Sequence, residues 1–266
     1  MLLAIDVGNT NTVFALYRER TLEAQWRLST NRERTAEEYA ALLLQLVGLR
    51  GFAAGDVGAV VIASVVPPAV LPLRRMSRDF FACEAFVVGE DLDYPIRIDL
   101  PNPAEVGADR VVNAVAAIER YRPPLVIVDF GTATTFDVVD GEGTYRGGAI
   151  APGINLSIDA LARAAAKLPR IAIEPPERVI GRSTIEAMQS GIFWGYVGLI
   201  EGLVARIKAE FGAPMTVIAT GGLAPLFFKR ASLFDHLDRD LTMAGLLAIY
   251  ERNRERVRAG KRPERS

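Results

Sequence analysis

The chain has 266 residues, half of them hydrophobic, and its 31 basic and 32 acidic side chains leave a net charge of −1. Such a length allows one large core or two modest ones, and the balanced charge gives no electrostatic reason to expect nucleic acid or a membrane surface as a partner. One cysteine, Cys83, excludes an intramolecular disulfide and fits a cytoplasmic location. One histidine, His236, in a charged stretch argues against a Ser-His-Asp triad and a Cys/His zinc site, so chemistry would rest on carboxylates, hydroxyls, amides and hard cations.

The apolar N-terminal run, which ends at Asp6, has no basic region before it and is too short for a signal peptide. The most apolar long stretch, residues 185–200, is too short and too polar for a membrane span. We therefore expect no membrane partner.

Two segments, residues 3–13 and 126–136, share one pattern: an apolar strand, then Asp-x-Gly, a turn rich in hydroxyl and amide side chains, and a second strand. The matched pairs at one constant offset are Asp6 with Asp129, Gly8 with Gly131, and Thr12 with Thr135. Each pair of strands leads through a turn to a third strand, expected over 22–28 and 144–150. Coincidence between two hairpins is the alternative, but residues 60–64 and 216–220 repeat in the same order and favour duplication.

Helices are expected over 35–47, 106–121, 155–166 and 184–211. The first and last of these begin with capping boxes, Thr35 with Glu38 and Ser183 with Glu186. Each half therefore reads as three antiparallel strands followed by helix, strand, helix and strand. The expected divisions are residues 1–122, residues 123–250 and a charged tail, 251–266, whose last dozen residues should be frayed.

The first Asp-x-Gly turn could bind phosphate. Gly8 lets the backbone turn sharply, turn amides can form an anion-binding concavity, and the side chains of Asn9, Thr10, Asn11 and Thr12 add neutral donors. Asp6 would repel phosphate directly but could hold Mg²⁺ through water. A plain hairpin is the competing interpretation of this loop taken alone.

A second such loop, residues 131–135, would grip the same triphosphate from the other half. Gly221 and Gly222, after a strand, suit a close backbone approach to adenosine, although they could also form a mere turn. A Walker loop and a complete Gly-x-Gly-x-x-Gly fingerprint do not occur.

These motifs resemble the type III pantothenate kinases, in the superfamily of acetate kinase, hexokinase, actin and the heat-shock chaperone ATPase. The resemblance spans about residues 2–250. The matching segments are 6–12 (DVGNTNT), 102–110 (NPAEVGADR), 129–135 (DFGTATT), 147–153 (GGAIAPG), 181–184 (GRST) and 219–222 (ATGG). The Gly-Ala-Asp-Arg block at 107–110 is the segment most specific to this branch.

The resemblance implies an α/β fold of duplicated actin/ribonuclease-H-like domains, each a mixed five-stranded sheet flanked by helices, with the active site in the cleft between them. It implies ATP-dependent phosphorylation of pantothenate to 4′-phosphopantothenate, the first step of coenzyme A biosynthesis, by a phosphotransferase with an alcohol acceptor. It also implies Mg²⁺, a monovalent cation (K⁺ or NH₄⁺), and a homodimer with substrate near the subunit interface. The alternatives are a nucleotide-binding regulator without turnover and a kinase of another small hydroxy acid.

Individual roles carry over from the resemblance. Asp109, early in a helix, is expected to be the general base, with Arg110 pairing the substrate carboxylate. Asp129 falls at the monovalent-cation position. The ATP-binding residues are expected to be Asp6, Val7, Gly8, Asn9, Thr10, Asn11, Thr12, Val13, Gly131, Thr132, Gly221 and Gly222. The substrate-binding residues are expected to be Gly107, Ala108, Asp109, Arg110 and, across the dimer interface, Thr184.

Two further features of the sequence bear on the site and the dimer. Leu100 stands where the family often has an aromatic residue, so either the pocket wall is aliphatic or Tyr94 substitutes. Four glycines recur at helical spacing and form one smooth face, which we expect either at the dimer interface or against the chain's own sheet: Gly191, Gly195, Gly198 and Gly202.

Overall fold

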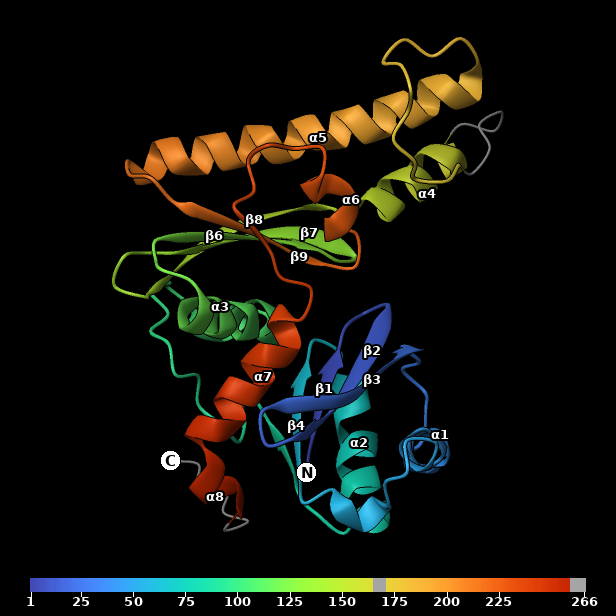
Figure 1. The fold of residues 1–266 in the computed structure, drawn as a ribbon, viewed down its shortest axis with the longest axis vertical. Helices are drawn as coiled ribbons and strands as arrows, with labels where there is room; N and C mark the ends of the chain where they lie inside the picture. The colour runs from blue at the N-terminus through green and yellow to red at the C-terminus, as the bar shows by residue number, and fades with distance from the viewer. Residues whose placement is uncertain (165–170, 259–266) are drawn as a thin grey trace. The chain divides into compact units, whose positions relative to one another are not determined.

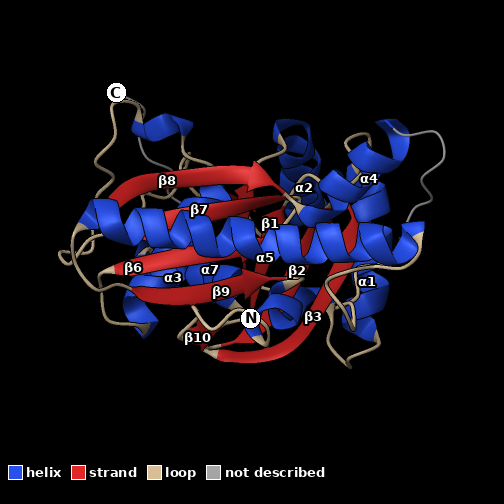
Figure 2. Ribbon diagram, turned by 90° about the horizontal axis from the view of Figure 1, so that it is seen from above, coloured by secondary structure: helices blue, strands red, loops and turns tan. Residues whose placement is uncertain are grey.

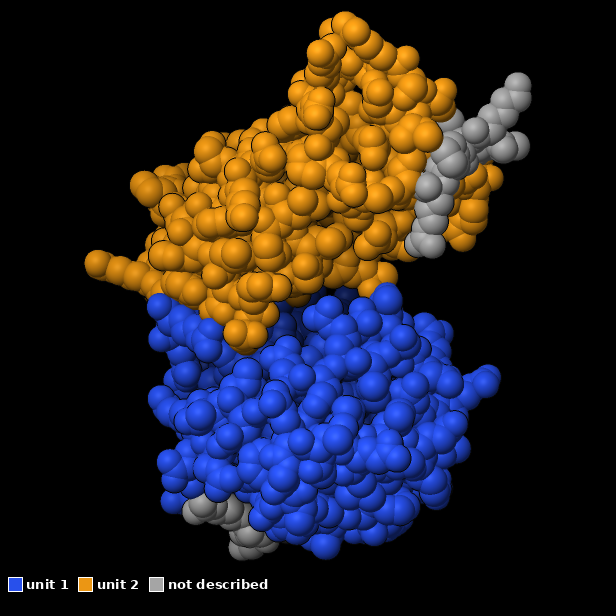
Figure 3. All heavy atoms as spheres, turned by 45° about the vertical axis from the view of Figure 1, so that its right-hand side comes forward, with its two compact units in different colours: residues 1–120, 241–266 blue, residues 121–240 orange. Residues whose placement is uncertain are grey.

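The computed structural model describes residues 1–164 and 171–258. The chain divides into two compact units: unit 1, Met1–Arg120 with Leu241–Ser266, and unit 2, Tyr121–Asp240 (Figure 1, Figure 3). Each unit contains a five-stranded sheet, with strand orders β3-β2-β1-β4-β5 and β10-β9-β6-β7-β8. Both sheets join an antiparallel meander to parallel strands, which confirms the prediction of duplicated, mixed five-stranded α/β domains.

Unit 1 is built on a sheet whose two faces are both buried. Its strands are β1 Leu2–Val7, β2 Asn11–Arg18, β3 Thr21–Ser29, β4 Ala59–Ser64 and β5 Ala85–Val87. Its helices are α1 Ala36–Gly48, α2 Pro67–Phe80, α3 Ala108–Arg120, α7 Leu241–Arg252 and α8 Arg254–Arg258, and short 3₁₀ turns occupy Ala54–Asp56 and Pro103–Glu105.

Alternation along β1 and β2 sends side chains to opposite faces. Ile5 and Phe14 pack with α1 and α2 on one face, whereas Ala4 and Ala15 pack with α3 and α7 on the other. Because helices cover both faces of the sheet, these strands are continuous apolar runs and do not alternate between apolar and polar residues.

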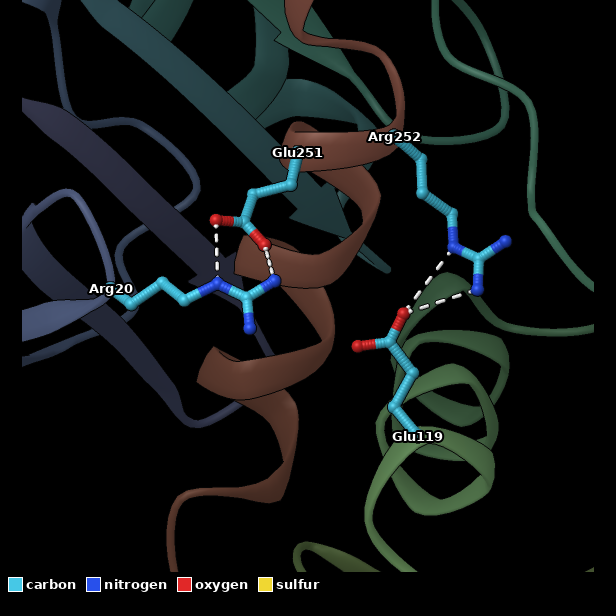
Figure 4. Close-up of polar contacts among 4 residues, drawn as sticks. All are labelled: Arg20, Glu119, Glu251 and Arg252. Carbon is cyan, nitrogen blue, oxygen red and sulfur yellow. Dashed lines mark hydrogen bonds and ion pairs between the residues drawn. The ribbon is translucent and has the colours of Figure 1, made fainter.

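Helix α7 belongs to unit 1, although the sequence-based division put residues 241–250 in the second half. The reason is close packing against α3, where a Cβ built on Gly245 would lie 2.1 Å from the Val112 carbonyl oxygen. At the C-terminal end of α7, ion pairs join Glu251 to Arg20 and Arg252 to Glu119 of α3 (Figure 4). Such exposed pairs contribute little, so the apolar packing holds the helix.

Unit 2 repeats the plan with a longer helical layer. Its strands are β6 Leu125–Phe130, β7 Ala133–Val139, β8 Tyr145–Pro152, β9 Thr216–Gly221 and β10 His236–Leu237. Its helices are α4 Ile154–Ala164, α5 Thr184–Phe211 and α6 Ala224–Phe228. Helix α5 lies over the sheet (Figure 1, Figure 2), where Phe193 and Ile200 join Val128 and Phe136 in one core.

The predicted helices occur, and their ends follow local chemistry. Helix α1 has the complete capping box of Thr35 and Glu38. In α5, Ser183 accepts from the Glu186 amide as predicted, but the Glu186 carboxylate reaches back to the amide of Arg182 instead. Helix α3 starts two residues later than predicted, because the backbone at Val106 is extended.

The C-terminal segment is more ordered than predicted at its start. Residues 254–258 form α8, and the Val257 side chain is buried in the unit 1 core. The rest of the predicted frayed tail, 259–266, lies outside the described residues. Among the described helices, none combines the length and apolar character needed to cross a membrane.

Candidate active site

The turn between β1 and β2 lies at the carboxyl end of β1. The Gly8 amide donates to the Asn11 carbonyl oxygen (3.0 Å), and Asn9 and Thr10 at the tip are exposed. Asp6 is half-buried and Val7 is buried on β1, whereas Asn11, Thr12 and Val13 begin β2. A Cβ at Gly8 would lie 3.2 Å from the Asn11 carbonyl oxygen, so a larger residue would crowd the close approach of the two strands.

Thr30, directly after β3, holds this turn through three hydrogen bonds. Its amide donates to the Thr10 carbonyl oxygen (2.9 Å), its hydroxyl donates to the Gly8 carbonyl oxygen (2.7 Å), and its Oγ1 lies 2.9 Å from Thr12 Oγ1. A hydroxyl carries one hydrogen, so the Thr12 hydroxyl must be the donor in the contact with Thr30. Thr12 is fully buried, and its proton is therefore directed into the turn.

Asp109 lies at the same edge of the sheet. The Val65 amide, just past β4, donates to the Val7 carbonyl oxygen (3.1 Å), and Val65 packs against Gly107, which precedes α3. In open α/β sheets, ligands bind at the carboxyl ends of parallel strands. The structure thus brings the phosphate-loop candidate and the predicted base to one edge within unit 1.

The Asp109 carboxylate is fixed by its own helix. Asp109 Oδ1 accepts the amide of Arg110 (2.8 Å) and lies close to Gly107, where a built Cβ would be 2.6 Å away, so a side chain at Gly107 would displace the carboxylate. Burial raises the pKa of Asp109, and the Arg110 amide and charge only partly offset this. Burial, together with the charge of Asp109, also raises the pKa of Tyr94, so this aromatic ring is within electrostatic reach of the predicted base.

The corresponding turn in unit 2, between β6 and β7, is one residue shorter. The Gly131 amide donates to the Ala133 carbonyl oxygen (3.1 Å), and Phe130 pairs with Thr134, as Val7 pairs with Thr12 in unit 1. The structural counterpart of Thr12 is therefore Thr134, which corrects the match with Thr135 inferred from a constant offset. Thr134 is fully buried and its hydroxyl contacts that of Tyr196 on α5.

Asp129 lies directly against the end of β9. Gly221 is in the left-handed region (φ 91°), and a Cβ there would lie 2.4 Å from Asp129 Oδ1. The Gly131 turn is adjacent, since its built Cβ would be 4.0 Å from the same oxygen. Two of the predicted ATP-binding glycines and the predicted cation ligand are thus neighbours within unit 2, and Gly222 follows in the turn before α6.

Gly153 is a further residue that packs against the second glycine turn. It lies between β8 and α4, where a built Cβ would be 2.2 Å from the Thr132 carbonyl oxygen and 2.9 Å from that of Gly131. The second turn therefore rests on the start of α4, and only glycine fits there. The Pro-Gly pair that ends the 147–153 segment, just before a helix, was the available signal.

The carboxylates beside the two turns suit a hard cation that is held by few protein ligands. No cluster of three or more His, Cys, Asp or Glu side chains able to hold a metal occurs in residues 1–164 and 171–258. Mg²⁺ keeps several waters and typically uses one or two carboxylates plus substrate phosphates. Asp6 and Asp129, each half-buried at a strand end beside a turn, fit this requirement.

Comparison with known proteins now decides the family. The family model of type III pantothenate kinases matches residues 2–206. The type III pantothenate kinase of Paramagnetospirillum magneticum is 60% identical over 259 residues, 97% of this chain and 100% of the relative. That of Rhodospirillum rubrum is 60% identical over 254 residues, 95% of this chain and 99% of the relative. This chain belongs to the type III pantothenate kinase family.

A solved structure described as a conserved Baf family transcriptional activator from Campylobacter jejuni has a TM-score of 0.61 at 17% identity, covering 95% of this chain and 99% of that one. At this identity the similarity shows the fold alone. The kinase family therefore rests on the sequence matches.

As a member of this family, the chain departs from the expected pattern at Leu100, which is half-buried. Thr184 begins α5 on an exposed first turn.

The glycine face of α5 points away from its own sheet: a Cβ at Gly191, Gly195 or Gly198 would meet nothing within 4 Å. Packing of these three glycines against the chain's own sheet, one of the two expectations, is therefore wrong.

Proposed function

We propose that this protein transfers the γ-phosphoryl group of ATP to the hydroxyl of pantothenate and forms 4′-phosphopantothenate, the first step of coenzyme A biosynthesis. Membership of the type III pantothenate kinase family supports the substrate assignment. The observation that carries the chemistry is the half-buried carboxylate of Asp109, at the sheet edge where the Gly8 turn begins. Both substrates are free metabolites, so we place the enzyme in the cytoplasm.

Asp109 acts as the general base. One carboxylate oxygen accepts the Arg110 amide, and the other accepts the proton of the pantothenate hydroxyl as that oxygen attacks the γ-phosphorus. The new oxygen–phosphorus bond forms as the bond from the γ-phosphorus to ADP breaks. Gly107, Ala108 and Arg110 bind the acidic substrate beside the base, with the guanidinium paired to its carboxylate.

The nucleotide is bound by the residues around the two glycine turns: Asp6, Val7, Gly8, Asn9, Thr10, Asn11, Thr12, Val13, Gly131, Thr132, Gly221 and Gly222. Asp6 would hold Mg²⁺ through water, and the bound ion would neutralise negative charge on the ATP phosphates. Asp129 would hold K⁺ or NH₄⁺. These assignments are supported by the half-buried carboxylates beside both turns and by the glycines that keep Asp129 and its turn in contact.

We place a homodimer contact on α5 and the segment before it. The open glycine face of this helix and the exposed Val179, Ile180 and Ile185 are apolar surface that a second copy could cover. Thr184 would then reach the substrate of the partner subunit. A molar mass from light scattering would test the dimer itself.

ADP release, coupled to NADH oxidation, tests the function directly. Pantothenate should raise turnover well above background hydrolysis, and omission of K⁺ and NH₄⁺ should lower it. Turnover with another hydroxy acid but not with pantothenate would move the assignment to a different acceptor. ATP binding without turnover on any acceptor would indicate a nucleotide-binding regulator.

A further inference from the structure

Thr30 lies outside the segment expected to contact ATP, yet its amide and hydroxyl are both bonded to the first glycine turn. It follows the last residue of β3, where Asn11 pairs with Ser29, and it is half-buried. We propose that Thr30 is a positioning residue, which sets the conformation of the Gly8 turn for ATP through its hydroxyl. This inference rests on the proposed function only for its kinetic consequence.

The backbone amide and the side-chain hydroxyl of Thr30 make different contacts with the turn. The amide of Thr30 donates to the Thr10 carbonyl oxygen and extends the β2–β3 ladder by one bond. The hydroxyl is bonded to the Gly8 carbonyl oxygen on one side and to Thr12 Oγ1 on the other. It therefore spans the base of the turn, from Gly8, the first residue after β1, to Thr12, the second residue of β2.

The hydrogen bonds run in one direction, from Thr12 to Thr30 to the Gly8 carbonyl. Each bond polarises the next, so the chain is stronger than its separate members. With its carbonyl held by Thr30 and its amide donated to Asn11, Gly8 has both backbone groups fixed before any ligand arrives.

Thr30 lies between two hydrogen-bonded segments of the chain. On one side it continues β3. On the other side, Asn31 Oδ1 accepts the Glu33 amide (2.9 Å), and the chain enters the capped start of α1 at Thr35. A turn fixed in advance loses less conformational entropy on binding, which is how a residue that touches no ligand can raise affinity.

The test uses Thr30→Val, which keeps the shape and the amide bond but removes the hydroxyl, and Thr30→Ser, which keeps the hydroxyl. Thr21→Val, at the exposed far end of β3, is the matched control. Loss of a partly buried hydrogen bond of about 1.4 kcal/mol corresponds to about a tenfold change. We expect Thr30→Val to raise the KM and Kd for ATP by about tenfold, with the KM for pantothenate within about twofold of wild type.

Hydrogen–deuterium exchange of the ligand-free protein tests the positioning without reference to catalysis. In Thr30→Val, the amides of residues 8–12 should exchange faster, while Thr30→Ser and Thr21→Val should match the wild type. Unchanged exchange and an unchanged Kd for ATP in Thr30→Val would overturn the proposal. So would a failure of Thr30→Ser to restore both, or an equal rise in the KM of both substrates. If the wild type does not phosphorylate pantothenate, the proposed function fails, but exchange and ATP binding still decide the role of Thr30.

Discussion

Replacing Asp109 with asparagine should separate catalysis from stability. The asparagine side chain can still present an oxygen to the Arg110 amide, so the start of α3 should be preserved. The substituted side chain cannot accept the substrate proton. General-base catalysis is typically worth about 10²–10⁴ in rate, so we expect kcat to fall by about that factor with little change in the Kd for ATP.

The same substitution should stabilise the protein at neutral pH. Folding raises the pKa of Asp109 above its ordinary value of 3.8, because burial disfavours the charged form. The stability contributed by the protonated carboxyl is therefore fully present below pH 3.8 and is lost as the pH rises through the raised pKa. A neutral amide avoids this loss, so Asp109→Asn should have a higher Tm than wild type at pH 7, and the difference should shrink as the pH falls.

Two measurements check this reasoning. Coupled ADP release gives kcat and both KM values across pH, and the acid limb of the wild-type profile should lie above pH 3.8. Differential scanning calorimetry at several pH values gives the Tm difference. Asp79→Asn, which alters an exposed carboxylate on α2, is the control and should leave kcat unchanged. Wild-type kcat in Asp109→Asn would remove the base from the mechanism, and a lower Tm at pH 7 would refute the account of its burial.

Three further substitutions probe the glycine contacts and the cation. Gly153→Ala should raise the KM for ATP strongly, because its Cβ would lie 2.2 Å from the Thr132 carbonyl oxygen. A displacement of about 1 Å can cost about 100-fold, and initial rates against ATP measure it. Gly245→Ala overpacks the contact with Val112, which typically costs about 1–3 kcal/mol, so thermal unfolding should shift down while both KM values stay unchanged. Asp129→Asn should weaken activation by potassium, since an amide is a poorer cation ligand, and a potassium titration of the rate would show it.

The repeated Asp-x-Gly pattern predicted the strand-turn-strand start of each half, because local residues determine strand ends and turns, whereas the fold class followed from the family resemblance. The sequence pattern could not show how the strands on either side of the second turn pair. Thr134 and Thr135 are adjacent and chemically alike, yet a one-residue shift places them on opposite faces of β7. Thr134 contacts Tyr196 of α5, and Thr135 bonds Asp137. Only the pairing of Phe130 with Thr134 distinguishes them.

The position of α7 was also beyond local reasoning. An apolar helix at the end of a duplicated chain can pack on either sheet, and its sequence position favoured the second. The deciding feature is a close contact between Gly245 and the backbone of Val112, residues far apart in sequence. Asp109 and the Gly8 turn lie at one edge for a similar reason: Val65 is bonded to Val7 next to the parallel pair of β1 and β4, and it also packs against Gly107. The sequence identified Asp109 and the Gly8 turn as site candidates but did not show that they lie at the same edge of the unit 1 sheet.

The two turns illustrate how a duplicated site can diverge while one requirement is kept. In each unit, a fully buried threonine follows the turn, and its hydroxyl is bonded to a residue outside the hairpin. Thr12 uses Thr30, at the end of a neighbouring strand, whereas Thr134 uses Tyr196, on a helix across the core. The strand pairs of each hairpin end where the turn begins, and in each unit a hydroxyl from outside the hairpin contacts the buried threonine that follows the turn.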